Sequence, residues 1–208
     1  MVSNPYPQID NDVVAPKRLA WLWIVAGFVG LFAAFSLTLE RIHVASNPDA
    51  TLSCDLNIFI SCKSVMLTDQ ARLLGFPNPL IGMMGFVAPI AVGVAVLAGA
   101  RFATWFWRTF LVGLTIGFIF VLWLWVQSTY VIGVLCPYCM VAWLAMIPLF
   151  IHTQLWMTAE DLIEAPVRWT NVIDALNSRA WLVTIGFELL MAALIVVRFW
   201  DFWPMLFR

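Results

Sequence analysis

The sequence predicts an all-α integral membrane protein, with a bundle of four transmembrane helices followed by a fifth transmembrane helix near the C-terminus. Apolar residues make up 63% of the 208 residues and charged residues only 11%, whereas a soluble domain carries roughly 25% charged residues. Mean hydropathy is +0.93. The apolar residues also form five runs of about 20 residues, the length that crosses a bilayer core as a helix.

The five apolar runs cover approximately residues 19–39, 80–99, 110–130, 136–156 and 180–200. The first run is too long for the apolar core of a cleavable signal peptide, and no small-residue cleavage pattern follows Leu39. We therefore expect it to remain in the mature protein as the first transmembrane helix.

Basic residues predict the orientation of these helices. Pairs of them precede the first run, join the second to the third and join the fourth to the fifth: Lys17 and Arg18, Arg101 and Arg108, Arg168 and Arg179. The positive-inside rule places these segments in the cytoplasm. The segment of residues 40–79, the turn before Cys136 and the C-terminus are then extracytoplasmic. Residues 40–79 also carry three basic residues, Arg41, Lys63 and Arg72, but acidic residues accompany them.

The cytoplasmic segments carry no motif. We expect residues 1–18 to form a loose cytoplasmic tail. We expect residues 157–179 to form one or two short interfacial helices that start at a possible cap, Thr158. Glu188 lies within the fifth run, where a charged side chain costs about 3 kcal/mol. We expect it to be structural, either protonated or hydrogen-bonded to a hydroxyl or an imidazole, rather than a proton relay.

All four cysteines fall on the predicted extracytoplasmic side, where disulfides persist. Cys136 and Cys139 form a Cys-x-x-Cys motif at the start of the fourth run, with Pro137 at the first helical position. The helix N-terminus stabilises a thiolate, and residues three apart share one face, so the two sulfurs can meet. Because a bridge across so short a loop adds little stability through chain entropy, the motif favours a redox-active pair.

Cys54 and Cys62 lie in the long polar segment between the first two runs. From Ser61 onward the pattern predicts a short helix, capped by Ser61 and ended by Gly75. Its apolar side could lie on the membrane surface.

Asn78 stands between two prolines just before the second run. Its amide could donate a hydrogen bond to a carbonyl group in a pocket, or it could cap the helix that follows. The spacing leaves both interpretations open.

Three chemistries fit four thiols on one membrane face. The thiols can exchange disulfides, form two structural disulfides that brace the loop of a non-enzymatic scaffold, or bind zinc as a set of four ligands. The wide spacing of Cys54 and Cys62 and an oxidising compartment disfavour zinc, so we assign no metal ligands. A net charge of -1 offers no basic surface for nucleic acid. The composition instead predicts that membrane lipid surrounds the protein.

The order of the cysteines resembles the bacterial branch of the vitamin K epoxide reductase (VKOR) family. The shared motifs are Ser53-Cys54-Asp55-Leu56, Ser61-Cys62-Lys63-Ser64, Asn78-Pro79-Leu80-Ile81-Gly82 and Cys136-Pro137-Tyr138-Cys139. They lie within residues 19–156. The quinone-linked thiol oxidase of proteobacteria has its Cys-x-x-Cys before the spaced pair, so the order here disfavours that family.

The resemblance implies a four-helix bundle in the bacterial cytoplasmic (inner) membrane that holds a quinone, menaquinone or ubiquinone, at its outer end. Cys139 would then react with the quinone, with Cys136 as its resolving partner. Cys54 and Cys62 would form the shuttle pair of the loop. The resting disulfides would be Cys54 with Cys62 and Cys136 with Cys139.

Two further residues take roles from the resemblance. Asn78 matches the Asn that hydrogen-bonds one quinone carbonyl. Trp143 stands where VKOR proteins place a Tyr for the other carbonyl, which leaves that contact and epoxide reduction open.

The function implied by the resemblance is that of a disulfide-generating thiol:quinone oxidoreductase. A reduced thioredoxin-fold (DsbA-like) partner outside the membrane would pass electrons to Cys54. Cys62 would then exchange with Cys136. Because the chain ends at Arg208 without a thioredoxin-like domain, we expect this partner to be a separate protein. Quinone or quinone-epoxide reduction as the main activity is the alternative within the enzyme class.

Overall fold

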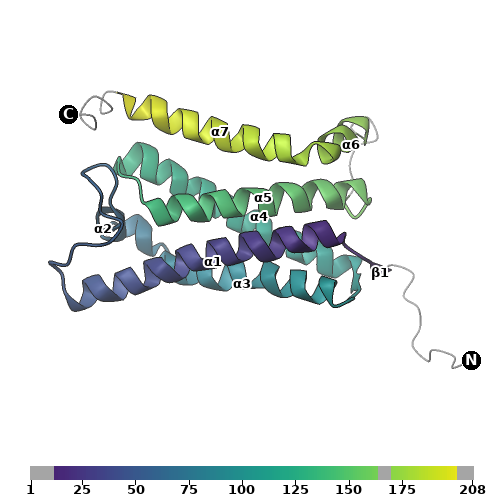
Figure 1. The fold of residues 1–208 in the computed structure, drawn as a ribbon, viewed down its shortest axis with the longest axis horizontal. Coiled ribbons are helices and arrows are strands. Elements are labelled where there is room, and N and C mark those ends of the chain that lie inside the picture. Colours follow the sequence, from purple (N-terminus) through teal and green to yellow (C-terminus); the bar gives the residue numbers. More distant parts are fainter. Residues whose placement is uncertain (1–11, 164–169, 201–208) are drawn as a thin grey trace, which may run out of the picture.

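Five apolar stretches satisfy their backbone hydrogen bonds internally as helices, as lipid surroundings require. The computed structural model describes residues 12–163 and 170–200. Its long helices lie side by side (Figure 1) and are α1 (Lys17–Ser46), α3 (Asn78–Leu97), α4 (Thr104–Val126), α5 (Pro137–Ala159) and α7 (Ala180–Arg198). Within the described residues, five helices are long and apolar enough to span a membrane. The predicted all-α membrane fold is confirmed.

Helix α1 is longer than its apolar run. It continues past the predicted end at Leu39 to Ser46, because Val44 packs against Leu52 and the cysteines of the following loop. The predicted loop of residues 40–79 therefore begins later, and Glu40 and Arg41 lie on a helix. At its far end, α4 continues as a π-helix, η2 (Gln127–Ile132).

The core of the bundle is built around α1 and α5. Helix α1 packs on α3 and α5, and α5 also packs on α4 and α7. Away from the cysteines, the three indoles of Trp23, Trp107 and Trp156 contact one another, and the Phe110 ring contacts the first two. The Trp23 Nε1–H donates to the Thr153 hydroxyl at 2.8 Å, which fixes α1 against α5.

The expectation of a loose N-terminal tail is wrong for the residues just before α1. Strand β1 (Asp12–Val13) pairs antiparallel with strand β2 (Phe102–Ala103), which precedes α4. The Trp107 Nε1–H donates to the Val13 carbonyl at 3.2 Å. Ala15 is buried in the core, and its burial holds this segment in place. The preceding part of the predicted tail lies outside the described residues.

The predicted start of an interfacial segment at Thr158 is also wrong. Helix α5 continues to Ala159, and the Thr158 hydroxyl donates to the Gln154 carbonyl inside the helix at 2.8 Å instead of capping a new one. A short helix, α6 (Thr170–Ser178), precedes α7. Residues 164–169 lie outside the described residues, as does the C-terminal end beyond residue 200.

Glu188 lies half-buried on α7, within the membrane-spanning part. It forms no ion pair with the described residues. The hydroxyl or imidazole expected as its hydrogen-bond partner is not found among them either. Of the two states predicted for Glu188, the protonated side chain is the one that remains as a prediction.

Candidate functional site

The four cysteines converge at the end of the bundle where α1 ends and α3 and α5 begin, which we name the cysteine end (Figure 1). Cys54 and Cys62 form a disulfide with a Cα–Cα distance of 5.7 Å. Cys136 is a buried free thiol and Cys139 a half-buried one. Three of the four sulfur-bearing residues are at most 5% exposed, so the reactive atoms are shielded from bulk solvent: Cys54, Cys62 and Cys136.

Cys62 is presented by a short helix, α2 (Cys62–Met66). Ser61 caps it as predicted, because its hydroxyl oxygen accepts the Ser64 N–H at 3.1 Å. The helix ends sooner than predicted, since Thr68 adopts an extended conformation and a separate turn, η1 (Asp69–Arg72), follows. Gly75 ends the segment in the left-handed region, with φ of 82°.

Backbone hydrogen bonds tie this loop to the segment before α5. The Ser61 N–H donates to the Leu135 carbonyl at 2.9 Å, and the Leu135 N–H donates to the Phe59 carbonyl at 2.8 Å. Ile60 and Leu135 thereby form a parallel bridge. Cys62 lies two residues after Ile60, and Cys136 directly follows Leu135, so the bridge brings the two cysteines together.

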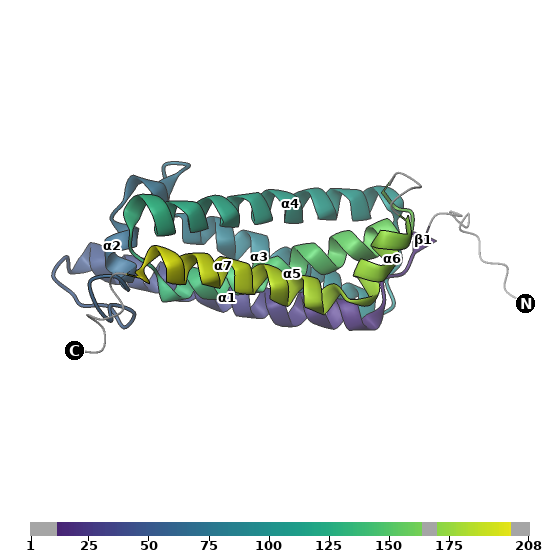
Figure 2. The ribbon, with the colours of Figure 1, turned by 90° about the horizontal axis from the view of Figure 1, so that it is seen from above.

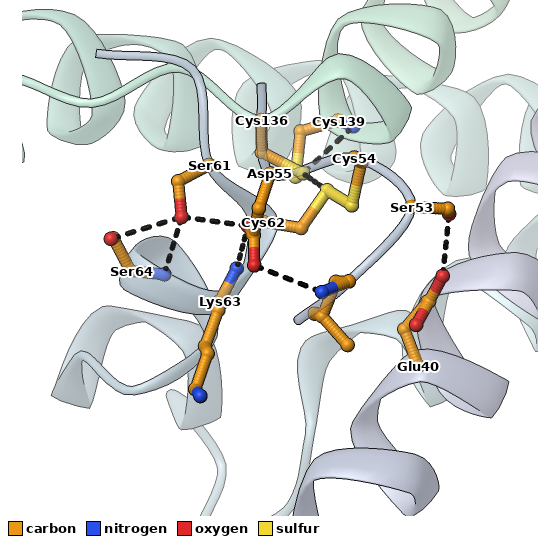
Figure 3. The surroundings of a disulfide bond; sticks show 11 residues. Glu40, Ser53, Cys54, Asp55, Ser61, Cys62, Lys63, Ser64, Cys136 and Cys139 are labelled. Carbon is orange, nitrogen blue, oxygen red and sulfur yellow. Dashed lines mark hydrogen bonds between the residues drawn. A yellow bond between two sulfur atoms is a disulfide. The ribbon is translucent and has the colours of Figure 1, made fainter. Parts of the chain in front are cut away.

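The sulfurs of the two pairs are in contact. Cys136 Sγ lies 3.4 Å from Cys62 Sγ, and the Cys139 N–H donates to Cys136 Sγ at 3.4 Å (Figure 3). Cys136 thus occupies the N-cap of α5 with Pro137 at the first helical position, as the motif predicted. The structure differs from the expected resting pairing, because Cys136 and Cys139 remain thiols while Cys54 and Cys62 are bonded.

The surroundings of Cys136 favour its thiolate. A hydrogen bond from the Cys139 thiol lowers the pKa of Cys136, burial opposes this, and the backbone N–H groups of Cys139 and Tyr138 lower it further. The carboxylate of Asp55 raises it slightly. The net pKa of Cys136 lies below the ordinary value for a thiol, and the thiolate is the species that attacks a disulfide.

Asp55 was not identified from the sequence, although it organises the loop. Its carboxylate accepts the Ser61 hydroxyl at 2.8 Å and the Lys63 N–H at 3.1 Å, and the Leu52 N–H at 3.2 Å (Figure 3). Burial raises the pKa of Asp55, but these hydrogen bonds outweigh it and lower the pKa below its usual value. The signal in the sequence was an acidic residue, Asp55, that precedes the start of α2.

An apolar cavity of about 120 Å³ lies beneath the cysteines. The reactive cysteines and the two other predicted site residues line it: Cys62, Cys136, Cys139, Asn78 and Trp143. Other parts of its wall come from α1, α2, α3 and α4, including Arg41, Met66, Phe86 and Leu124. A flat apolar ligand with a few polar atoms fits such a pocket.

Comparison of the sequence with known proteins identifies the family to which this arrangement of cysteines belongs. A family model described as the vitamin K epoxide reductase family matches residues 21–154, which include all four cysteines and the whole cavity wall. The chain belongs to this family. Its function is therefore that of a quinone-linked thiol–disulfide oxidoreductase. No curated protein matches the chain.

The match to the VKOR family ends within α5, so α6 and α7 lie beyond it. The resemblance in the sequence is confirmed at the level of the family. The bacterial origin stays a prediction. So does the placement of the cysteine end outside the cytoplasm.

Asn78 does not cap α3 through its side chain, and a hydrogen bond from Asn78 to a ligand carbonyl stays a prediction. It is the first residue of α3 and 7% exposed. Its amide oxygen accepts the Leu73 N–H at 3.0 Å, and its amide N–H₂ donates to the Gln70 carbonyl at 2.6 Å. Asn78 therefore fixes η1 over the cavity, while the second N–H of the amide remains for another acceptor.

Trp143 is 4% exposed and lies against the cavity one helical turn beyond Cys139. An indole offers a flat apolar face and a single N–H donor. Among the described residues, no group of three or more His, Cys, Asp or Glu side chains is placed to hold a metal ion.

Proposed function

We propose that this VKOR protein oxidises the thiols of a separate thioredoxin-fold protein outside the cytoplasm and passes the electrons to a membrane quinone. The contact between Cys62 Sγ and Cys136 Sγ at 3.4 Å is the observation that carries this proposal. A thiolate at that distance from a disulfide sulfur can exchange with it through a small shift of either side chain.

The electron path follows from the order of the sulfurs. The partner's thiolate attacks Cys54 and is released as a disulfide, leaving Cys54 and Cys62 reduced. Cys62 then exchanges with an oxidised Cys136–Cys139 pair, which leaves Cys136 and Cys139 as the thiols present in this structure. Each exchange transfers two electrons and breaks one S–S bond for each one formed.

The last step regenerates the Cys136–Cys139 disulfide. Two thiols lose two electrons and two protons, and the quinone gains both and becomes a hydroquinone. We assign the reaction with quinone to Cys139, because it lines the cavity at the start of α5. Asn78 is the proposed hydrogen-bond donor to a quinone carbonyl, and Trp143 the proposed apolar wall beside the ring.

A second feature supports a quinone as the substrate. Helices α3 and α4 barely touch, and an apolar groove of about 780 Å³ runs between them. The groove shares Gly82, Phe86 and Phe120 with the cavity. In Figure 2, α4 runs along one edge of the bundle. Membrane quinones carry a long isoprenoid chain, and a groove open toward lipid accommodates such a chain while the ring lies by the cysteines.

The proposed activity is tested with purified protein, a reduced thioredoxin-fold protein and quinone, by following quinone absorbance and partner oxidation separately. Cys139→Ala should abolish quinone reduction. Cys54→Ala should block electron transfer from the partner, yet still allow a dithiol that reduces Cys136–Cys139 directly to drive quinone reduction. Asn78→Ala should raise the KM for quinone and spare the exchange with the partner.

Two results would contradict the proposal. One is wild-type protein that reduces no quinone with any thioredoxin-fold partner. The other is equal loss of both activities in Cys54→Ala and Cys139→Ala, because the assigned roles differ.

The proposed orientation has its own test. A cysteine placed at the exposed Ile58 of the loop should react with a membrane-impermeant thiol reagent added to intact cells. A cysteine placed near Lys17 should react only after the cells are opened. The reverse pattern would put the cysteine end in the cytoplasm.

A further inference from the structure

Arg41 lines the cavity beneath the cysteines, and nothing in the proposed electron path uses it. It lies on the part of α1 that extends beyond the apolar run. A guanidinium N–H donates to the Met66 carbonyl at the C-terminus of α2. Since Met66 also lines the cavity, the guanidinium lies at the wall between α1 and α2.

No carboxylate among the described residues forms an ion pair with Arg41. Among the described residues that line the cavity, Arg41 alone carries a charged side chain. The one ion pair in the described part of the chain joins Arg72 to Asp69. The neighbouring Glu40 accepts a hydrogen bond from the Ser53 hydroxyl.

Arg41 is partly buried, and burying an unpaired cation is costly unless something balances its charge. The bond to Met66 uses one of the five N–H donors of a guanidinium. The remaining donors and the full charge stay available to an anion. The cavity is where the quinone reaction is proposed to place negative charge.

We propose that Arg41 binds and stabilises the negative charge that develops on a quinone oxygen while Cys136 and Cys139 are oxidised. This inference rests on the proposed function. In the reaction two S–H bonds break, one S–S bond forms, and two electrons pass to the quinone, whose oxygens then take up the two protons. A fixed cation at that point favours the charged arrangement more than the neutral quinone.

The test separates charge from hydrogen bonding at one position. Arg41→Gln keeps a donor for the Met66 carbonyl but removes the charge, and Arg41→Lys keeps the charge. Arg72→Gln is the matched control, because Arg72 is an exposed cation of the same region that does not line the cavity.

Binding is measured with two naphthoquinones that differ in charge, by quenching of tryptophan fluorescence in the oxidised protein. The probes are 2-hydroxy-1,4-naphthoquinone, an anion at neutral pH, and its neutral ether 2-methoxy-1,4-naphthoquinone. Wild type, Arg41→Lys and Arg72→Gln should bind the anion about tenfold more tightly, relative to the ether, than Arg41→Gln does. Quinone turnover by Arg41→Gln should fall in kcat more than it changes KM.

An unchanged preference for the anion in Arg41→Gln would overturn the role of Arg41. So would an equal loss of preference in Arg41→Lys, because that result assigns the effect to shape and not to charge. Thiol exchange with the partner verifies that each variant is folded. If wild type binds the anion through Arg41 yet reduces no quinone, the proposed function fails and the anion site remains.

Discussion

At the scale of single residues, the chemistry depends on where Cys136 lies. Its sulfur contacts Cys62 Sγ on one side and accepts the Cys139 N–H on the other. It is therefore placed between the disulfide it would exchange with and the thiol it would pair with. Asp55 fixes the loop side of this contact by accepting hydrogen bonds from Ser61 and Lys63.

The lowered pKa of Cys136 gives a prediction for its titration. Because the side-chain hydrogen bond from Cys139 is the largest cause, Cys139→Ala should raise the pKa of Cys136, whereas Cys139→Ser keeps a donor and should raise it less. With Cys54 and Cys62 bonded, Cys136 is the one free thiol in both variants. The pKa of Cys136 is measured by following the ultraviolet absorbance of the thiolate against pH.

The lowered pKa of Cys136 fixes the direction in which stability changes with pH. A thiol whose pKa is lowered in the folded protein is a thiolate at a lower pH than in the unfolded chain. The stability that its ionisation adds is present above the unfolded pKa and lost as pH falls through the folded one. The rate at which the Cys136 thiolate attacks the Cys54–Cys62 disulfide, the reverse of the proposed exchange, falls over the same range. Identical titrations of the Ala and Ser variants would rule out the hydrogen bond as the cause.

At the scale of elements, the site depends on the close approach of α1 and α3. A Cβ on Gly93 of α3 would lie 2.7 Å from the Ala20 carbonyl oxygen of α1, so only glycine fits there without moving a helix. These two helices supply Arg41 and Asn78 to the cavity wall. The close approach of α1 and α3 at this level depends on the missing side chain of Gly93.

Gly93→Ala should destabilise the protein by about 1–3 kcal/mol, the usual cost of overpacking. Gly85→Ala is the matched control on the same helix, because a Cβ at Gly85 meets nothing within 4 Å. Thermal unfolding in detergent measures both variants. A Gly93→Ala protein as stable as Gly85→Ala would mean that α1 and α3 are not closely packed at this level.

At the scale of the whole molecule, the cavity and the groove between α3 and α4 are neighbours that share wall residues. Helix α5 packs against both α1 and α7. Helix α4 touches α5 but hardly α3. We propose that a ligand with a long apolar chain enters from the membrane on the α3–α4 side, where the groove lies.

Filling the groove should discriminate between quinones by their chains. Ala88 of α3 lines the groove, so Ala88→Trp should lower kcat/KM for a long-chain isoprenoid quinone at least several-fold and leave a quinone without a chain unaffected. Val87 is exposed on the same helix but does not line the groove, so Val87→Trp is the control. Equal effects of the two substitutions on both quinones would show that the groove takes no part.

The local features of the site could be predicted from the sequence. Apolar runs of membrane-spanning length, the N-caps at Ser61 and Cys136, and the left-handed Gly75 each depend on neighbouring residues alone. The family followed from the order of the four cysteines and is confirmed. Where α1 ends could not be predicted, because its last turns are held by Val44 packing against the loop.

The sequence by itself thus determined the membrane fold and the family. Only the tertiary structure decided that Cys62 contacts Cys136, because the bridge between Ile60 and Leu135 joins segments 75 positions apart. It also placed Arg41 on the cavity wall and gave Asn78 two backbone partners. Periodicity and capping report the interactions of near neighbours, whereas the distance between two sulfurs depends on how helices distant in the chain pack together.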